Sequence, residues 1–209
     1  MTEQWQCWRR NLKILQADQG TQEWLDARLG RPSASQFCKL ITTAGKPSAS
    51  ADDYISEMIA ERITGEREPN YVNEWMQRGT ELEPEARATY EFIHGVDVEE
   101  VGFILDDSGE FGCSPDGLVG EDGGVEFKCP APKNHIAWSR KGVCPSKHYA
   151  QVQGCLYITG RKWWDFMSYH PEMKPFIVRV ERDEEFIEKL AEQISLAVEE
   201  IKSEVRNLT

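Results

Sequence analysis

The spacing of apolar side chains changes at about Gly95, and this change divides the chain into two kinds of secondary structure. Before Gly95, apolar residues recur every three or four positions, which is typical of amphipathic helices. After it come short runs rich in Val, Phe and Leu, separated by glycines, which indicate strands. A helical pattern returns at the end of the chain. The sequence therefore predicts an α/β fold with helices first, a mixed central sheet and a closing helix.

Capping residues before each apolar pattern, and glycines after it, locate the helices. We expect helices over 21–29, 32–40, 50–63, 71–77, 81–93, 145–159 and 183–207. Thr21, Ser50 and Asp183 are the expected N-caps, and a break is expected near Gly79. The last helix carries apolar residues at helical spacing: Phe186, Leu190, Ile194, Ala197, Val198 and Ile201.

The strands are expected in the second half, over 96–105, 111–119, 124–128, 162–169 and 175–181. The 209 residues contain no internal repeat and no low-complexity linker, which favours a single domain. Within that domain, 1–95 are expected to be mainly helical, 96–181 to form the sheet core, and 183–207 to form the C-terminal helix.

The charge balance at first argues against nucleic acid. There are 24 Lys and Arg against 36 Asp and Glu, a net charge of −12, whereas binding phosphates requires basic side chains. The distribution changes this picture. Residues 106–127 hold seven acidic and no basic residues, 183–206 carry a net −5, and 128–164 hold seven basic and no acidic residues. The two acidic segments together account for the whole net charge of −12, so the rest of the chain is neutral, and one of these segments adjoins a basic stretch.

The remaining composition indicates a soluble cytoplasmic protein. No apolar run approaches the roughly 18–20 residues of a membrane span, and the N-terminus has no signal-peptide core. The cysteines form no C-x2-C pair, which argues against zinc and iron–sulfur sites. We expect all six to be reduced and mostly buried: Cys7, Cys38, Cys113, Cys129, Cys144 and Cys155.

The acidic segment 106–127, with the adjoining Lys128, contains the pattern most indicative of a catalytic or metal-binding site. Glu126 and Lys128 lie two residues apart on a predicted strand and therefore on the same face, while Phe127 points to the opposite, apolar side. If the glycine-rich turn 120–124 closes a hairpin, Asp116 comes opposite Glu126. Two carboxylates and one ammonium would then converge.

This trio suits a magnesium site. Asp116, Glu126 and a backbone carbonyl, that of Phe127, would supply hard oxygen ligands for Mg²⁺. Such a metal polarises a phosphodiester and lowers the pKa of bound water, and Lys128 can orient or deprotonate that water. The alternative is an ordinary tight turn with surface acids, because Asp-Gly sequences are common turn formers.

Pro115–Asp116 followed by Glu126–Phe127–Lys128 resembles the core of the PD-(D/E)XK nucleases. The wider segments 113–118 and 126–130 resemble the phage lambda exonuclease family, also called YqaJ-like viral recombinases. Three further segments, 24–35, 78–87 and 149–153, are similar to that family in the same order. The resemblance therefore implies an alkaline exonuclease of a phage or prophage.

The resemblance implies a restriction-endonuclease-like core, with a central mixed sheet flanked by helices. It implies a Mg²⁺-dependent, ATP-independent 5′→3′ exonuclease that degrades one strand of double-stranded DNA to mononucleotides and leaves a 3′ overhang for strand annealing. Two Mg²⁺ ions are expected, with Mn²⁺ as a substitute. The implied partners are a 5′-phosphorylated DNA end, two further copies in a homotrimeric ring, and a single-strand annealing protein in the bacterial host cytoplasm.

The same resemblance implies roles for individual residues. Asp116, Glu126 and the Phe127 carbonyl would hold the metals, Lys128 would serve the water, and Glu83 would add a helical carboxylate. Arg28, Ser33 and Ser35 would bind the terminal 5′-phosphate. Capping a helix is the alternative for Ser33, and supporting the turn is the alternative to phosphate binding for Ser114.

Two matters stay open at the level of sequence. Gln151 and Gln153 differ by about 200° around a helix, so only one can face the site, and Gln153 is expected there while Gln151 contacts DNA. The family carries a basic residue after the E-x-K-C-P run, and here Lys133 or His135 is expected to replace it as a phosphate contact.

Four tryptophans are candidates for wedging at the duplex end: Trp5, Trp8, Trp24 and Trp75.

Two other functions compete with this one. The first is a different PD-(D/E)XK nuclease, either an endonuclease or a RecB- or Cas4-like enzyme, although the cysteine spacing does not support an iron–sulfur cluster. The second is a DNA-end-binding recombination protein without turnover, against which the intact set of Asp116, Glu126 and Lys128 argues.

Overall fold

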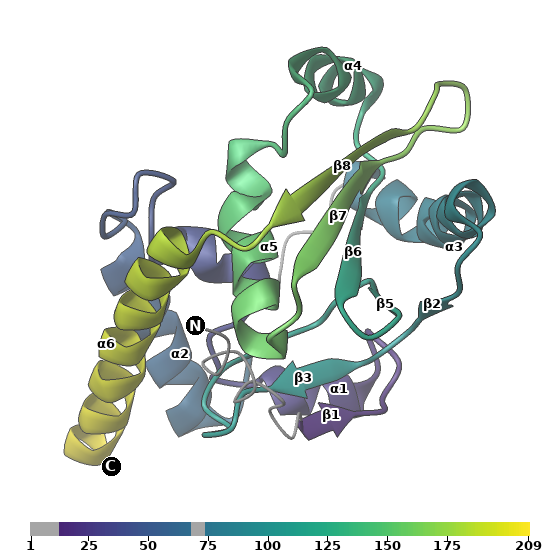
Figure 1. Ribbon diagram of the computed structural model, residues 1–209. Coiled ribbons are helices and arrows are strands. Elements are labelled where there is room, and N and C mark those ends of the chain that lie inside the picture. Colours follow the sequence, from purple (N-terminus) through teal and green to yellow (C-terminus); the bar gives the residue numbers. More distant parts are fainter. Residues whose placement is uncertain (1–12, 68–73) are drawn as a thin grey trace.

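The computed structural model describes residues 13–67 and 74–209 (Figure 1). Its centre is a five-stranded mixed sheet in the order β2-β5-β6-β7-β8. Only β6 and β7 run parallel, and the other neighbours are antiparallel. The α/β prediction is thereby confirmed. The strands are β2 (Val98–Glu99), β5 (Gly117–Val119), β6 (Gly123–Lys128), β7 (Trp163–Ser168) and β8 (Phe176–Glu181).

A second, smaller antiparallel sheet has the order β1-β3-β4 and consists of β1 (Lys13–Leu15), β3 (Phe103–Leu105) and β4 (Gly112–Cys113). The continuous strands expected over 96–105 and 111–119 are therefore wrong, because each is divided between the two sheets. Gly102 lies at one of these crossings, where a side chain would clash with the backbone oxygens of Leu15 and Ala17. That close approach lets the chain pass from one sheet to the other.

Helices cover both faces of the larger sheet (Figure 1). They are α1 (Gln22–Arg28), the 3₁₀ helix η1 (Ala34–Lys39), α2 (Ala51–Thr64), α3 (Glu74–His94), α4 (Pro132–Lys141), α5 (Ser146–Thr159) and α6 (Glu184–Leu208). Val125 and Phe127 of β6 pack with Ala86 and Tyr90 of α3 in one core. Trp164 of β7 packs with α5 and α6 in a second and larger core. The sheet thus separates two apolar layers.

Two of the expected helix caps are present. The Thr21 side chain accepts a hydrogen bond from the Trp24 N–H, and that of Asp183 accepts one from Phe186. Ser50 is at the expected N-cap position of α2, but its side chain makes no capping bond and its hydroxyl lies instead near Ser48. The six apolar residues predicted on the last helix are all buried.

Two predictions in the helical regions are wrong. Gly79 does not break the chain into two helices, because α3 is continuous through Gly79 and Pro84. Burial of Ala86 and Tyr90 against the sheet holds the second half of α3 in place and outweighs the weak helix propensity of Gly79 and Pro84. The pattern also missed α4, in which His135 is the buried residue. The expected start at Tyr71, like Trp5, Trp8 and Cys7, lies outside the described residues.

No helix within 13–67 or 74–209 is long and apolar enough to cross a membrane. The five cysteines in these ranges are free. Cys113, Cys129 and Cys155 are buried, whereas Cys38 is exposed. The prediction of reduced cysteines holds for these five, and the prediction of burial holds for most of them.

Candidate active site

The hairpin of β5 and β6 brings the two predicted carboxylates together. Gly117 pairs with Val125, so Asp116 lies opposite Glu126 one step further along. The Asp116 Oδ2 atom accepts a hydrogen bond of 2.7 Å from the backbone N–H of Phe127. Phe127 itself packs into the apolar layer beneath α3. The alternation predicted for this strand is therefore confirmed, and the acidic side chains share the opposite face with Lys128.

Glu126 is fully buried at the centre of the site. Its Oε1 atom contacts the ammonium of Lys128 and accepts a hydrogen bond of 2.6 Å from the Gln151 amide on α5. Its Oε2 atom is also buried but has no hydrogen-bond partner among the described residues. A buried carboxylate oxygen without a partner is costly. The position therefore calls for a further positive group.

Burial, together with the crowding of acidic groups, changes the pKa values of these side chains. Burial, followed by the charge of Asp116, raises the pKa of Glu126 to about 8. Burial and Asp116 likewise raise the pKa of Glu83 to about 7. Burial raises the pKa of Asp116 too, although Lys128 and the Phe127 N–H oppose the rise. Burial disfavours the charged form of Lys128, but Glu126 and Asp116 outweigh it and keep its pKa above the usual value.

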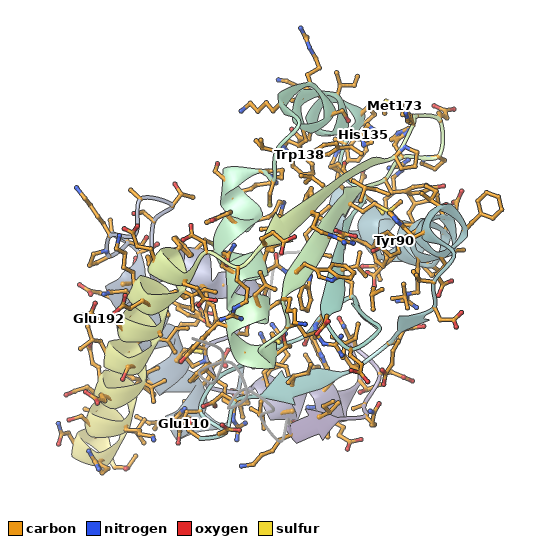
Figure 2. The ribbon with its side chains drawn as sticks, viewed as in Figure 1. Tyr90, Glu110, His135, Trp138, Met173 and Glu192 are labelled. Atoms are coloured by element: carbon orange, nitrogen blue, oxygen red, sulfur yellow. The ribbon has the colours of Figure 1, made fainter. Side chains whose placement is uncertain are left out.

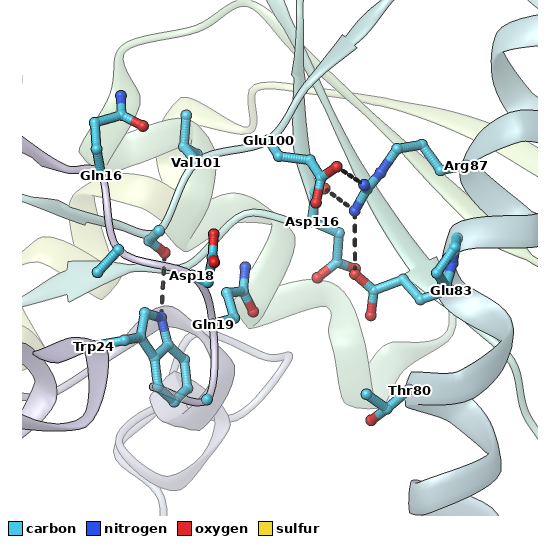
Figure 3. A pocket seen from close by; sticks show the side chains of 14 residues that line it. Gln16, Asp18, Gln19, Trp24, Thr80, Glu83, Arg87, Glu100, Val101 and Asp116 are labelled. Atoms are coloured by element: carbon cyan, nitrogen blue, oxygen red, sulfur yellow. Dashed lines mark hydrogen bonds and ion pairs between the residues drawn. The ribbon is translucent and has the colours of Figure 1, made fainter. Parts of the chain in front are cut away.

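Glu83 extends this group from α3, and Arg87 links it to the hairpin (Figure 3). The Nη2 atom of Arg87 lies 3.6 Å from the Glu83 carboxylate and 3.5 Å from the Asp116 carbonyl oxygen, while Nη1 pairs with Glu100. Trp24, Thr80 and these acidic residues line a first cleft of about 500 Å³. Glu83 thus belongs to the site, as expected from the family resemblance.

A second cleft of about 640 Å³ opens beside the same residues. It shares Thr80 and Glu83 with the first cleft, and its wall also includes Trp75, Lys128, Asn134, Trp138 and Lys147. Trp138 and His135 project from α4 on the side that faces the sheet (Figure 2), where Trp138 contacts Phe166. The two clefts therefore meet at Thr80 and Glu83.

The donor set fits a divalent cation of the Mg²⁺ type. Two carboxylates with raised pKa values lie face to face, and a buried oxygen of Glu126 lacks a partner. Among the described residues, no three His, Cys, Asp or Glu side chains are close enough to form a complete ligand set. Asp116 and Glu126 would therefore require oxygen from the backbone or from water, which is the coordination that Mg²⁺ favours. The Phe127 carbonyl as a ligand stays a prediction.

The predicted phosphate-binding residues gather around one guanidinium. The Nη1 atom of Arg28 donates a hydrogen bond of 3.0 Å to Ser114, and Nη2 donates to Ser33 at 3.2 Å and to Ser35 at 3.4 Å. Residues of segments 24–35 and 113–118, both of which resemble the family, therefore lie side by side in the structure. Ser33 occupies the N-cap position of η1, but its side chain makes no capping bond and is bonded to Arg28 instead. Ser114 is the direct link between the pocket and the hairpin that carries Asp116.

Arg28 is held in place by an aromatic side chain. Its guanidinium lies 4.3 Å from the centre of the Trp24 ring, and the Trp24 indole N–H donates to the same Ser114 hydroxyl at 3.0 Å. Burial, followed by the charge of Arg67, lowers the pKa of Arg28 to about 10. The partners of the guanidinium are neutral hydroxyls, and no carboxylate in the described parts of the chain is bonded to it. Trp24 therefore supports this pocket, and its role as a wedge stays a prediction.

The two glutamines of α5 have the opposite arrangement to the one expected. Gln151 donates to Glu126 and therefore lies in the active site. Gln153 is fully buried, donates to the Glu181 carbonyl at 2.9 Å and accepts from the Asp183 N–H at 3.0 Å. The prediction of Gln153 as an active-site residue is wrong, because its amide connects α5 to the start of α6.

Neither expected replacement for the family's basic residue reaches the site. His135 is buried, with Nδ1 bonded to Ser168 at 2.8 Å and Nε2 to the Lys174 carbonyl at 3.2 Å, so its proposed phosphate contact is wrong. Lys133 is exposed on α4 and lines neither cleft. Lys147 does line the second cleft. In the sequence, Lys147 is one of seven bases in the stretch 128–164, and no local signal distinguishes it from the others.

Comparisons with known proteins agree with this geometry. The family model of the YqaJ-like viral recombinase domain matches residues 23–162. The chain is similar to an alkaline exonuclease from Laribacter hongkongensis, with 39% identity over 90% of this chain and 96% of the other and a TM-score of 0.83. A structure of that enzyme with dAMP gives the same identity and coverage and a TM-score of 0.82.

A more distant similarity concerns the fold alone. A phage-related exonuclease from Haemophilus somnus 129PT is 17% identical, with a TM-score of 0.66 over 86% of this chain and 96% of the other. No curated protein matches the chain at a significant level. The family model spans both the phosphate pocket and the carboxylate hairpin.

Proposed function

Because the chain belongs to the family of YqaJ-like viral recombinase domains, we propose that it is a Mg²⁺-dependent, ATP-independent 5′→3′ exonuclease acting on double-stranded DNA. It removes mononucleotides from one strand and leaves a 3′ single-stranded overhang. Family membership and the 39% identical alkaline exonuclease support a nuclease role. The polarity, the metal and the overhang are parts of the proposal.

One observation carries the polarity. The anion pocket around Arg28 is joined to the carboxylate hairpin through Ser114, two residues before Asp116. A guanidinium with three hydroxyls is suited to a terminal phosphate, because it offers two parallel donors and the hydroxyls can donate as well. We expect an end held at Arg28 to bring the next phosphodiester to the carboxylates. Cleavage there releases the terminal nucleotide and starts from a 5′-phosphorylated end.

Asp116 and Glu126, with the Phe127 carbonyl, would hold Mg²⁺. When bound, the metal would polarise the phosphodiester and lower the pKa of a coordinated water. The residues of the chain divide the remaining tasks. The Lys128 ammonium donates hydrogen bonds to the attacking water and to the phosphate, and so offsets negative charge that develops during the reaction. Gln151 orients the Glu126 carboxylate through its 2.6 Å hydrogen bond.

Glu83 has a supporting role in this proposal. Its pKa of about 7, raised mainly by burial, allows it to exchange a proton near neutral pH. Arg87 holds its carboxylate near the Asp116 backbone. Glu83 therefore receives a hydrogen bond from water at the edge of the site, or donates one when protonated.

The proposal includes an assembly. A globule of 209 residues has a radius of gyration of roughly 17 Å, too small to encircle a duplex. The family resemblance suggests a homotrimeric ring, whose channel would retain the DNA between successive cuts. A single-strand annealing protein in the bacterial cytoplasm would take up the emerging 3′ strand.

Digestion of defined ends tests the function. We expect Mg²⁺-dependent release of mononucleotides from linear 5′-phosphorylated duplex, slower release from a 5′-hydroxyl end, and no cutting of closed circular DNA. Cutting of circles would show an endonuclease instead. Binding of ends without any release of nucleotides, with Mg²⁺ or Mn²⁺ present, would leave an end-binding protein.

A further inference from the structure

The second cleft has a composition that the catalytic steps above do not use. Trp138, Trp75, Asn134 and Lys147 contribute to its wall, and within the described parts of the chain none of them is hydrogen-bonded or ion-paired to the carboxylates. Trp75 is 50% exposed. The Lys147 ammonium lies 4.8 Å from the centre of the Trp138 ring. A cation beside a flat aromatic face is thus presented next to the reaction centre.

The charge in this cleft is mainly positive. Lys128 and Lys147 both line it, and Glu83 is the acidic residue in its wall. The two ammonium groups are near enough that Lys128, after burial, lowers the pKa of Lys147. The Nε2 atom of His148, also in the wall, is buried and has no partner among the residues that the structure describes. Positive groups, an aromatic platform and an amide together suit a nucleotide.

The order of the sites along the DNA strand follows from their positions. Trp24, which shares Ser114 with Arg28, lines the first cleft and not the second. Lys128 and Phe127 line the second and not the first. If the terminal phosphate is bound at Arg28, the strand passes the carboxylates and leaves on the side of Lys147. The second cleft would then lie downstream of the cleaved bond.

We propose that the second cleft is a binding subsite for the nucleotide on the 3′ side of the cleaved bond. Lys147 pairs with the phosphate that follows this nucleotide, and Trp138 packs against its sugar and base. This subsite rests on the proposed 5′→3′ polarity. Lys147, at the start of α5, also provides the basic group expected from Lys133 or His135, neither of which lines the cleft.

Binding by an inactive enzyme tests the subsite without turnover. In a Lys128→Ala background, Lys147→Gln should weaken binding of a short 5′-phosphorylated duplex about tenfold and reduce the salt dependence of binding by about one phosphate contact. Lys147→Arg, which keeps the charge, should restore most of the affinity. Lys133→Gln is the matched control, because it removes an exposed lysine of α4 outside the cleft.

A chemical substitution in the DNA makes the test specific to one contact. When the phosphate after the second nucleotide is replaced by an uncharged methylphosphonate, the enzyme with Lys147 should bind the duplex no more tightly than the Lys147→Gln variant. The losses of affinity from the substitution and from the methylphosphonate should therefore not add. In the otherwise unaltered enzyme, Lys147→Gln should raise KM about tenfold and leave the preference for a 5′-phosphate over a 5′-hydroxyl unchanged.

The outcomes separate the subsite from the function. If the wild type digests phosphorylated ends but Lys147→Gln binds and cuts like Lys133→Gln, the subsite is refuted and the proposed function stands. Additive losses from Lys147→Gln and the methylphosphonate would equally refute it. If the wild type releases no nucleotide from phosphorylated ends, the proposed function fails and the subsite fails with it.

Discussion

The molecule contains two polar clusters joined by Ser114, and they are opposite in charge. Around Arg28, one cation is surrounded by neutral hydroxyls. Around Glu126, carboxylates lie close together, and burial, followed by the charge of Asp116, raises the pKa of Glu126 to about 8. Each cluster also leaves one buried atom without a partner among the described residues, Arg28 Nε in the first and Glu126 Oε2 in the second. The charge that each cluster lacks indicates its ligand: an anion for the first and a cation for the second.

Both clusters destabilise the folded protein, and packing elsewhere in the fold offsets this loss of stability. Burying unpaired charge destabilises a protein unless the surrounding packing is strong. The carboxylate hairpin lies between the two apolar layers of the larger sheet, and its Phe127 is anchored beneath α3. The Arg28 pocket instead rests on the Trp24 ring. The packing under α3 therefore holds the carboxylates, and the Trp24 ring holds the Arg28 guanidinium, where burial disfavours their charged forms. Such perturbed groups are typical of functional sites.

The largest effect is expected at the carboxylate cluster. Lys128→Ala removes the ammonium that contacts Glu126, so the release of mononucleotides should fall by about 10²–10⁴. Binding of a 5′-phosphorylated duplex should persist, because the Arg28 pocket is unchanged. Nucleotide release and filter binding measure the two quantities, with Lys133→Ala as the control. An equal loss of binding and cutting would show that Lys128 only holds the DNA.

The second effect is expected at the anion pocket and should concern the DNA end. Arg28→Ala removes donors to three hydroxyls, and contacts with a charged group contribute factors of about 10–100. Initiation on 5′-phosphorylated ends should slow by that factor and become equal to initiation on 5′-hydroxyl ends. Arg28→Lys should restore only part of it, because an ammonium has no bidentate fork. A phosphate preference that survives Arg28→Ala would contradict the pocket.

The glutamines of α5 provide a matched pair with a smaller effect. Gln151→Ala should lower the rate of cutting about tenfold through loss of its bond to Glu126, while thermal stability is kept. Gln153→Ala should lower the free energy of unfolding by about 1–3 kcal/mol, since it leaves the Glu181 carbonyl and Asp183 N–H unpaired. Parallel assays of rate and urea unfolding separate the two. The opposite assignment of rate and stability would contradict the structure.

This pair also shows where prediction from sequence ends. The alternation within one strand is enough to place Glu126 and Lys128 together, and a glycine-rich turn is enough to bring Asp116 opposite them. The rotation of a helix about its own axis has no such local signal. Both Gln151 and Gln153 have polar partners, so polarity could not distinguish them. The packing of α5 between the sheet and α6 decides which side chain faces the carboxylates.

The same limit explains the errors in the fold. Thr21 and Asp183 are local caps and were predictable. Continuity of α3 through Gly79 depends on distant contacts of Ala86 and Tyr90 with the sheet, which no local pattern reports. Lys147 was hidden for a similar reason, because many basic residues share its stretch of sequence. Only the fold places it beside Trp138.

A further effect is expected in the stability of the metal-free protein. The pKa of Glu126 is about 8 in the folded state against an ordinary 4.5, so the folded protein binds this proton more tightly than the unfolded chain. The resulting stability is complete below about pH 4.5 and is lost as the pH rises through 8. A tenfold difference in proton affinity between the two states corresponds to about 1.4 kcal/mol. With a chelator present, urea unfolding should therefore require less urea at about pH 8 than at about pH 6.

Glu126→Gln is the control for this pH dependence, because it removes the titrating group and keeps nearly the same shape. Its stability should vary less with pH between about 6 and 8 than that of the wild type. Added Mg²⁺ should stabilise the wild type more at the higher pH, since binding requires both Asp116 and Glu126 to be deprotonated. Mg²⁺ should have little effect on the variant. If the free energy of unfolding of the wild type and of Glu126→Gln depended on pH in the same way, the charge of Glu126 would not destabilise the folded protein. The carboxylate cluster would then not differ from the Arg28 pocket in the way described above.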